Sequence, residues 1–256
     1  MQVFLSYRED EKGKEYASAL REELAILGIN AIMASRSIRP GAVWAQTILE
    51  HLEASSALLC IASRGYTESP WCQQEIGWAI GHGIPVLWMC YDSKEHSVGF
   101  LMDKQELDVP DPSSQAETAR EIGTWLAAQE KTREEARATF IRALADSSTY
   151  RQTRDIVYAL ATLDSLTDDE WQQIDEAAAT NRQVREAHFY SDRNNGMSGI
   201  PVTDWLRRQL NKSANNTWPR RLPVSILKTR GGGRAPRRDP RLSEAITSCY
   251  SRGSTR

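Results

Sequence analysis

The chain has 256 residues, a mass of 28.9 kDa and a formal net charge of −2. Hydrophobic residues make up 40% and charged residues 26%, a balance that excludes a fibre, a wholly disordered chain and a disulfide-stapled miniprotein. The length allows one large domain or two small ones. No stretch approaches the roughly 20 apolar residues of a membrane span. Because residues 1–5 are expected to form a strand, no signal peptide is expected before them, and the predicted location is the cytoplasm.

The cysteines and histidines give no sign of a disulfide framework or a metal site. The four cysteines form no CxxC pair: Cys60, Cys72, Cys90 and Cys249. We expect buried free thiols in a reducing compartment. The four histidines have no metal-ligand spacing among them, so no metal is predicted: His51, His82, His96 and His188.

The small net charge hides an uneven distribution. Residues 212–256 hold eleven Lys or Arg and two Asp or Glu, a balance of +9, which leaves 21 basic and 32 acidic residues, or −11, for residues 1–211. The acidic body is not drawn to nucleic acid by its charge, so only the tail is expected to offer such attraction. The tail has little apolar surface to offset its ordering entropy, and we expect it to be mostly disordered.

The first half of the chain alternates between strand and helix patterns. Apolar runs predict strands at 3–5, 31–33, 57–61 and 84–90, with a weaker fifth within 100–109. Helical spacing predicts helices at 11–27, around 48–52, at 70–83 and at 114–130. Strict alternation implies a parallel sheet covered by helices on both faces, so we predict an α/β, flavodoxin-like five-stranded sheet of order 2-1-3-4-5.

The second half of the chain lacks apolar strand runs and is predicted to be all-α. Amphipathic patterns predict helices at 133–145, 150–163, 168–189 and 201–210. Thr167 and Glu170 have the spacing of a capping box. We therefore divide the chain into an α/β domain at 1–131, a small helical domain at 132–211 and the basic tail at 212–256.

Three loops are expected to meet at one edge of the sheet. Ligands of open α/β sheets bind beyond the carboxyl ends of the strands, and the segments at these ends are 6–10, 35–44 and 63–75. Together they supply arginines, aromatic rings and a carboxylate. This combination suits a ligand with a flat base, hydroxyl groups and negative charge.

These loops also carry a family resemblance. The chain resembles the Toll/interleukin-1 receptor (TIR) domain, over about residues 1–130, in three stretches: Phe4-Leu5-Ser6-Tyr7, Arg39-Pro40-Gly41 and Ser69-Pro70-Trp71-Cys72-Gln73-Gln74-Glu75. The last stretch is most similar to plant and bacterial TIR domains, many of which cleave NAD⁺ at the nicotinamide–ribose bond. The resemblance implies that Glu75 is catalytic, that NAD⁺ is a substrate with no further cofactor, and that TIR domains stack to complete the site.

The chemistry of that bond agrees with a site built on one carboxylate. Nicotinamide departs neutral and needs little acid help, and the transition state resembles an oxocarbenium ion that a carboxylate stabilises. Around Glu75, an indole four residues earlier can stack on a base, arginines can pair with the diphosphate, and rings from neighbouring loops can close the pocket. The predicted substrate-binding residues are Ser6, Tyr7, Arg8, Arg36, Trp44 and Trp71.

Each of these residues also has an ordinary structural interpretation. Glu75 could be a solvated residue in the first turns of a helix, and Trp71 and Trp44 could pack against the sheet or under a loop. Arg36 could be a solvated loop charge, and Cys72 is interpreted as a spectator thiol. The sequence also departs from the family, because Phe100 is not followed by the tryptophan that often accompanies it.

Two functions remain open at the level of sequence. The first is an NAD⁺ glycohydrolase or cyclase that gives nicotinamide and either ADP-ribose or a cyclic isomer; analogy with bacterial relatives suggests an antiphage immune effector. The alternative is a non-catalytic scaffold that associates through the Arg39-Pro40-Gly41 loop. In both cases self-association is expected, with the helical region controlling it or docking a protein partner that senses infection.

Overall fold

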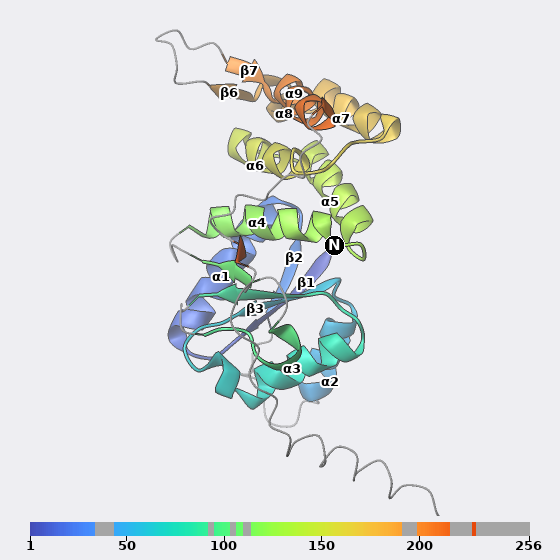
Figure 1. The fold of residues 1–256 in the computed structure, drawn as a ribbon. Helices are drawn as coiled ribbons and strands as arrows, with labels where there is room; N and C mark the ends of the chain where they lie inside the picture. The colour runs from blue at the N-terminus through green and yellow to red at the C-terminus, as the bar shows by residue number, and fades with distance from the viewer. Residues whose placement is uncertain are drawn as a thin grey trace, which may run out of the picture.

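The structure is a computed structural model, which describes residues 1–33, 44–91, 95–102, 106–109, 114–190, 199–215 and 227–228. Strands and helices alternate through its first half (Figure 1). In chain order they are β1 (Gln2–Tyr7), α1 (Glu11–Ile26), β2 (Asn30–Met33), α2 (Trp44–Glu53), β3 (Ala57–Ile61), α3 (Pro70–Gly81), β4 (Val86–Cys90), β5 (Glu106–Asp108) and α4 (Gln115–Ala128). Two short 3₁₀ turns follow β3 and β4: η1 (Tyr66–Glu68) and η2 (Gly99–Leu101).

The central sheet confirms the predicted topology. Its order is β2-β1-β3-β4-β5-β8, and the first five strands are parallel. The sixth strand, β8 (Leu227–Lys228), comes from the basic tail and pairs antiparallel with β5. The tail therefore contributes an edge strand that its composition did not predict, while its other residues from 216 onward lie outside the described part of the chain.

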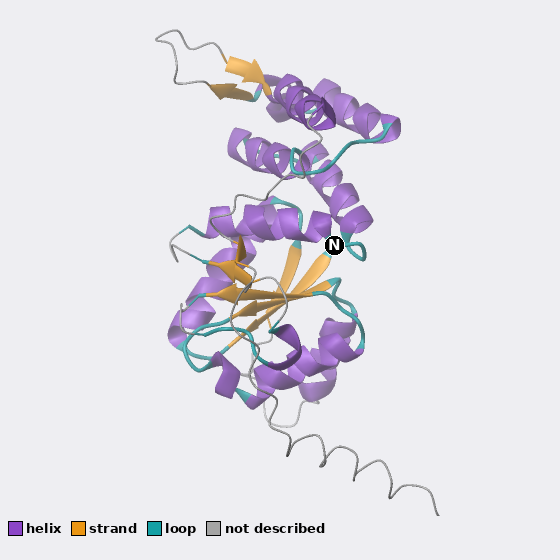
Figure 2. Cartoon of the chain, viewed as in Figure 1, coloured by secondary structure: helices purple, strands orange, loops and turns teal. Residues whose placement is uncertain are grey.

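Alternation along the strands separates the core into two clusters, one on each face of the sheet. In β1, Val3 and Leu5 join the cluster that contains residues of α1 and α4, whereas Phe4 joins the cluster that contains residues of α2 and α3. This period of two follows from the pleat of a strand. Figure 2 shows the strands between these helical layers. The predicted helices cover both faces of a parallel sheet, as the flavodoxin-like interpretation requires.

Local signals in the sequence fix the end of α1 and the start of α3. Gly28 adopts a φ of +78° directly after α1, the left-handed conformation that glycine accepts with least strain, and confirms the predicted stop. Helix α3 begins with Ser69 as its N-cap, whose hydroxyl accepts from the Cys72 N–H at 3.4 Å, and with Pro70 in its first turn. Helix α3 buries one side against the sheet, and Glu75 lies on that side.

The second half contains more turns and strands than the sequence predicted. It comprises α5 (Arg133–Ala145), α6 (Tyr150–Leu160), α7 (Asp168–Thr180), α8 (Arg182–Glu186), β6 (His188–Tyr190), β7 (Gly199–Pro201) and α9 (Val202–Asn215). The capping box of Thr167 and Glu170 is confirmed. A single helix over 168–189 is wrong, because Asn181 is extended, ends α7 and caps α8 with its side chain. The absence of strands is also wrong, since β6 and β7 pair antiparallel.

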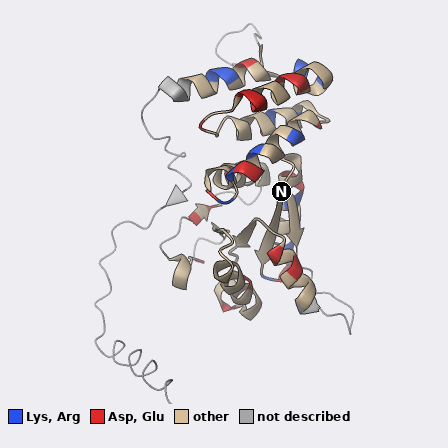
Figure 3. Cartoon of the chain, turned by 90° about the vertical axis from the view of Figure 1, so that its right-hand side faces the viewer, with Lys and Arg blue, Asp and Glu red and all other residues tan. Residues whose placement is uncertain are grey.

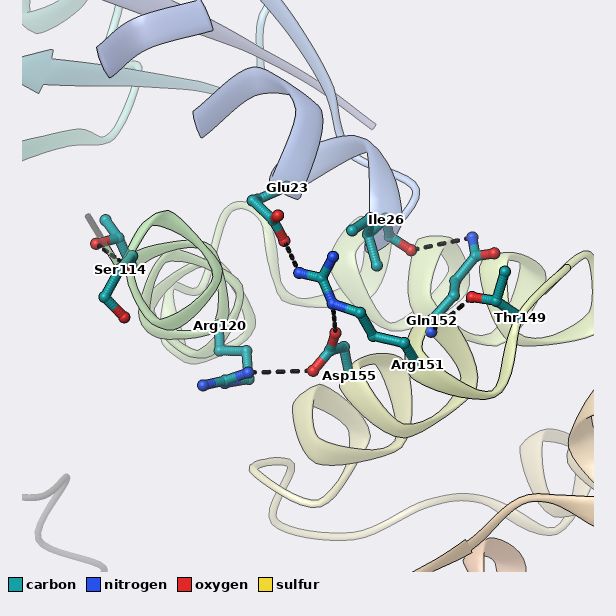
Figure 4. Close-up of polar contacts among 9 residues, drawn as sticks. Glu23, Ile26, Ser114, Arg120, Thr149, Arg151, Gln152 and Asp155 are labelled. Carbon is teal, nitrogen blue, oxygen red and sulfur yellow. Dashed lines mark hydrogen bonds and ion pairs between the residues drawn. The ribbon is translucent and has the colours of Figure 1, made fainter. Parts of the chain in front are cut away.

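The helices after α4 share a hydrophobic core with the sheet. One cluster of buried residues runs from β1 through α1 and α4 to α5, α6 and α9. Polar contacts reinforce this contact (Figure 4): Arg151 of α6 bonds Glu23 of α1 at 2.5 Å, and Arg120 of α4 bonds Asp155 of α6 at 3.1 Å. Figure 3 shows acidic and basic residues interspersed over these helices. The division at residue 132 stays a prediction.

Two further expectations concern burial and membranes. Cys60, Cys72 and Cys90 are buried and form no disulfide within the described part of the chain, whereas Cys249 lies outside it. Among the helices that the structure describes, none has the length and apolar character needed to cross a bilayer.

Candidate active site

Glu75 lies in the second turn of α3, beneath the carboxyl ends of β1 and β3. Glu75 is only 4% exposed, so its carboxyl group lies inside the protein instead of in bulk water. The hydroxyl of Ser6, near the end of β1, donates a hydrogen bond to Glu75 Oε2 at 2.5 Å. Removing a carboxyl group from water carries a large desolvation penalty unless hydrogen bonds compensate it. A residue kept in such a place is a candidate functional group.

Tyr66 completes this contact into a directed chain of hydrogen bonds. Its hydroxyl lies 2.6 Å from Ser6 Oγ. A serine hydroxyl has one proton to donate, and that proton is directed to Glu75, so Tyr66 is the donor to Ser6. The Tyr66 ring is fully buried and contacts Trp88 edge-on, with 5.2 Å between ring centroids. The ring therefore fixes the hydroxyl that orients Ser6, and Ser6 in turn orients the carboxyl group.

Burial shapes the protonation of the groups around this chain. Burial raises the pKa of Tyr66 well above its ordinary value, so the phenol keeps its proton at neutral pH. Burial likewise raises the pKa of Cys60, the residue paired with Ser6 across β1 and β3. Cys60 is therefore a neutral thiol and a poor nucleophile. Cys72 is buried as well, and its Sγ contacts the Tyr7 carbonyl oxygen at 3.6 Å.

The structure brings Ser6 into hydrogen-bond contact with Glu75, whereas the other described candidates lie in different surroundings. Tyr7 is buried, but its ring joins the core cluster that contains residues of α1, on the opposite face of the sheet. Arg8 lies over the turn before η1, where its Nη1 donates to the Arg64 carbonyl at 2.6 Å. Trp71, one helical turn before Glu75, is 39% exposed and so does not pack into the core of the sheet.

Two of the predicted substrate-binding side chains, those of Arg36 and Trp44, lie outside the described part of the structure. Arg36 lies outside the described residues, as does the Arg39-Pro40-Gly41 stretch. Trp44 begins α2, but its side chain is not among those described. Their roles in binding stay predictions.

Two contributors to the site were not singled out in the sequence. Tyr66 stands in the segment after the third strand, where its position alone signals the ligand edge. Glu95 follows β4, and its carboxylate accepts from the Gly65 N–H at 2.5 Å and from the Thr67 hydroxyl at 3.2 Å. Glu95 therefore holds the turn that carries Tyr66. This long-range contact has no counterpart in sequence spacing.

Comparison with known proteins identifies the class of the α/β region. A family model described as the TIR domain matches residues 3–126, the span from β1 into α4. These residues form a TIR domain, and the protein is a TIR domain protein, as the three sequence stretches indicated. TIR domains include both NAD⁺-cleaving and signalling members, and they commonly self-associate.

The other comparisons add little. No curated protein matches the chain. A solved structure of a 2-deoxyribosyltransferase from Bacillus psychrosaccharolyticus is 15% identical, with a TM-score of 0.35, over 45% of this chain and 90% of that one. At this TM-score the similarity carries no argument about function.

Proposed function

We propose that this protein cleaves NAD⁺ at the nicotinamide–ribose bond, with Glu75 as the catalytic carboxylate. The observation that carries the proposal is the buried chain from Tyr66 through Ser6 to Glu75 at the ligand edge of a TIR domain. The products are nicotinamide and either ADP-ribose or a cyclic isomer. The α/β fold alone does not select this activity, since one fold hosts many functions.

The mechanism follows from charge development in the substrate. As the bond to nicotinamide breaks, positive charge moves from the pyridinium ring to the ribose, while nicotinamide leaves as a neutral molecule. The Glu75 carboxylate stabilises the resulting sugar cation, and Ser6 holds the carboxylate in one orientation through its 2.5 Å bond. A preorganised electrostatic group of this kind lowers a barrier by roughly 2.7–4 kcal/mol.

The second half of the reaction sets the product. Attack by water on the ribose cation gives ADP-ribose, whereas attack by the adenine base of the same nucleotide gives a cyclic isomer. The outcome depends on how far the aromatic side chains fold the nucleotide and exclude water.

The burial of Glu75 predicts that activity is limited by access. At 4% exposure the carboxylate is closed to a nucleotide, so substrate entry requires the surrounding loops to move. We infer that association of TIR domains favours the open arrangement, which makes turnover rise faster than protein concentration. Loss of NAD⁺, or production of a signal nucleotide, would suit a cytoplasmic immune effector against phage. In this role the helical region either controls assembly or docks a protein partner that senses infection.

The test is nicotinamide release from NAD⁺ by the full chain at high concentration. Glu75→Gln preserves shape and a hydrogen-bond acceptor for Ser6, and is expected to lower kcat by about 10²–10³-fold. Glu53→Gln removes an exposed carboxylate at the end of α2 and serves as the matched control. Mass spectrometry identifies the second product.

The same burial favours one alternative, a non-catalytic scaffold in which Glu75 only supports the fold. In that case the full chain assembles, as followed by light scattering, but releases no nicotinamide at any concentration. Equal activity of Glu75→Gln and the parent chain would also reject the catalytic proposal.

A further inference from the structure

A second group of reactive side chains lies on β4, on β5 and in the segment after β4. The candidate active site, with Ser6 and Tyr66, lies near the ends of β1 and β3. Cys90 ends β4, His96 lies in the loop that follows, and Glu106 begins β5. One ligand atom from each lies within 4.8 Å of the other two. In the parallel register Glu106 pairs with Trp88, so Cys90 and Glu106 project from the same face of the sheet on adjacent strands.

Two of the three distances between ligand atoms in this group match those of a tetrahedral zinc site, and the third lies within 4.8 Å. Zinc binds thiolate sulfur at about 2.3 Å, imidazole nitrogen at about 2.0–2.1 Å and carboxylate oxygen at about 2.0–2.2 Å. At tetrahedral angles these lengths place sulfur and oxygen about 3.5 Å apart, and nitrogen and oxygen about 3.3 Å apart. In the protein, Cys90 Sγ lies 3.5 Å and His96 Nδ1 lies 3.2 Å from the same Glu106 oxygen, Oε2.

We propose that Cys90, His96 and Glu106 bind a divalent cation of the zinc class. A thiolate, an imidazole and a carboxylate together favour Zn²⁺ over the harder Mg²⁺ and Ca²⁺, which prefer oxygen ligands. The three side chains leave a fourth tetrahedral position for water. On binding, the thiol proton of Cys90 passes to solvent and His96 carries its proton on Nε2, so one proton leaves for each ion bound.

The surroundings of Glu106 preorganise this site. The Ser97 backbone N–H donates to Oε1 of Glu106 at 2.7 Å, which turns Oε2 toward the other two side chains. The Ser97 hydroxyl donates to the Leu101 carbonyl at 3.1 Å and so anchors the loop. Outer contacts of this kind orient metal ligands. Cys90 and Glu106 are buried, whereas the His96 side chain is 43% exposed and gives an ion a route from solvent.

The segment that carries His96 is also connected to the candidate active site, through its neighbour Glu95. Glu95 precedes His96 directly, accepts from Gly65 and Thr67 with its carboxylate, and accepts from Trp88 Nε1 at 3.0 Å with its carbonyl oxygen. An ion on His96 would fix this segment and thereby the turn that carries Tyr66. This consequence rests on the proposed NAD⁺ cleavage and predicts that turnover changes with metal occupancy; metal binding itself does not depend on it.

The experiment measures metal binding directly, with Co²⁺ as a spectroscopic probe for Zn²⁺. The full chain is purified without a histidine tag, stripped with a chelator and carries Cys249→Ser to remove the tail thiol. Titration is expected to give one Co²⁺ per chain with a thiolate-to-cobalt charge-transfer band. Added Zn²⁺ is then expected to displace the Co²⁺, so that the band disappears. His96→Gln is expected to weaken binding by about 100-fold or more, because even outer contacts of a metal site are worth 10–100-fold.

Matched variants make the result decisive. His82→Gln changes another exposed histidine, which is stacked on Trp78 at the end of α3, and is expected to bind Co²⁺ unchanged. Cys90→Ser is expected to abolish the charge-transfer band. The proposal is overturned if no band forms, or if His96→Gln binds Co²⁺ as tightly as the parent chain; this variant alters an exposed side chain and so decides the matter even where Cys90→Ser fails to fold.

Discussion

The two faces of the central sheet treat buried polar groups differently. On the α3 face, hydroxyl and carboxyl groups of Tyr66, Ser6 and Glu75 lie in the interior, where desolvation disfavours the charged form. On the α1 and α4 face the interior is largely apolar, and ion pairs such as Arg151–Glu23 lie near its margin. The comparison indicates that the α3 face buries reactive groups at a cost in folding stability, and that the apolar core on the α1 and α4 face offsets this cost.

The largest expected effect tests the stabilising face. Phe140 of α5 is 0% exposed and lies against Gly123 of α4. Phe140→Ala leaves a cavity there and is expected to lower the free energy of unfolding by about 3–5 kcal/mol. Phe100→Ala, at a residue 87% exposed, is the control and should have little effect. Chemical denaturation of the full chain measures both variants. If Phe140→Ala lowered the free energy of unfolding by less than Phe100→Ala does, the stabilising role of this face would be rejected.

A glycine on the same side tests how closely the helical layers approach. At Gly28 a Cβ would lie 2.8 Å from the Ala143 Cβ, on a backbone with φ of +78°. Gly28→Ala therefore meets a clash in addition to about 1–2 kcal/mol of backbone strain. Gly77→Ala, in α3 with no atom within 4 Å of the added Cβ, is expected to stabilise by about 0.5–1 kcal/mol. Opposite signs in thermal unfolding would support the prediction, and equal signs would reject it.

Tyr66→Phe tests the reactive face without removing the ring. The variant loses the hydroxyl that donates to Ser6 but keeps the ring against Trp88. If Tyr66 positions Ser6 for catalysis, kcat falls by about tenfold with KM nearly unchanged, the equivalent of one hydrogen bond. Tyr16→Phe removes a buried hydroxyl that bonds Thr118 and should leave kcat unchanged. A fall in stability with no change in kcat would assign Tyr66 a structural role only.

The smallest effect concerns acid sensitivity. Burial alone would raise the pKa of Glu170, but hydrogen bonds from Arg137 and Thr167 outweigh it and hold the pKa below its ordinary value. A depressed folded pKa contributes stability above the ordinary value, and that stability is lost as pH falls through the folded value. Unfolding midpoints measured from about pH 6 to about pH 3 should therefore fall less in Glu170→Gln than in Glu176→Gln, an exposed residue of the same helix.

The sequence predicted those features that depend on local pattern. Apolar runs such as 57–61 located the strands, and Gly28 ended a helix where left-handed backbone was needed. The break at Asn181 was missed because one residue with a capping side chain outweighs a continuing helical pattern. The hairpin of β6 and β7 was missed because each strand has three residues, too few to show alternation.

The candidate site divides in the same way. Ser6 and Glu75 could be found because parallel topology brings loops together at one edge, and the structure joins them by a hydrogen bond. The group of Cys90, His96 and Glu106 could not be found from histidine spacing, because its geometry depends on the register between β4 and β5 and on the loop between them.

Helix α4 has a practical consequence for work on this protein. It contributes seven buried residues while it contacts α1 on one side and α5 and α6 on the other. A fragment cut after residue 131 would lose the helices that pack on α4, including Phe140 against Gly123, and would leave apolar surface of α4 exposed to water. If such a fragment were inactive or aggregated, the cause would be the loss of the helices that pack on α4. The behaviour of the fragment is therefore a poor guide to how the intact protein assembles.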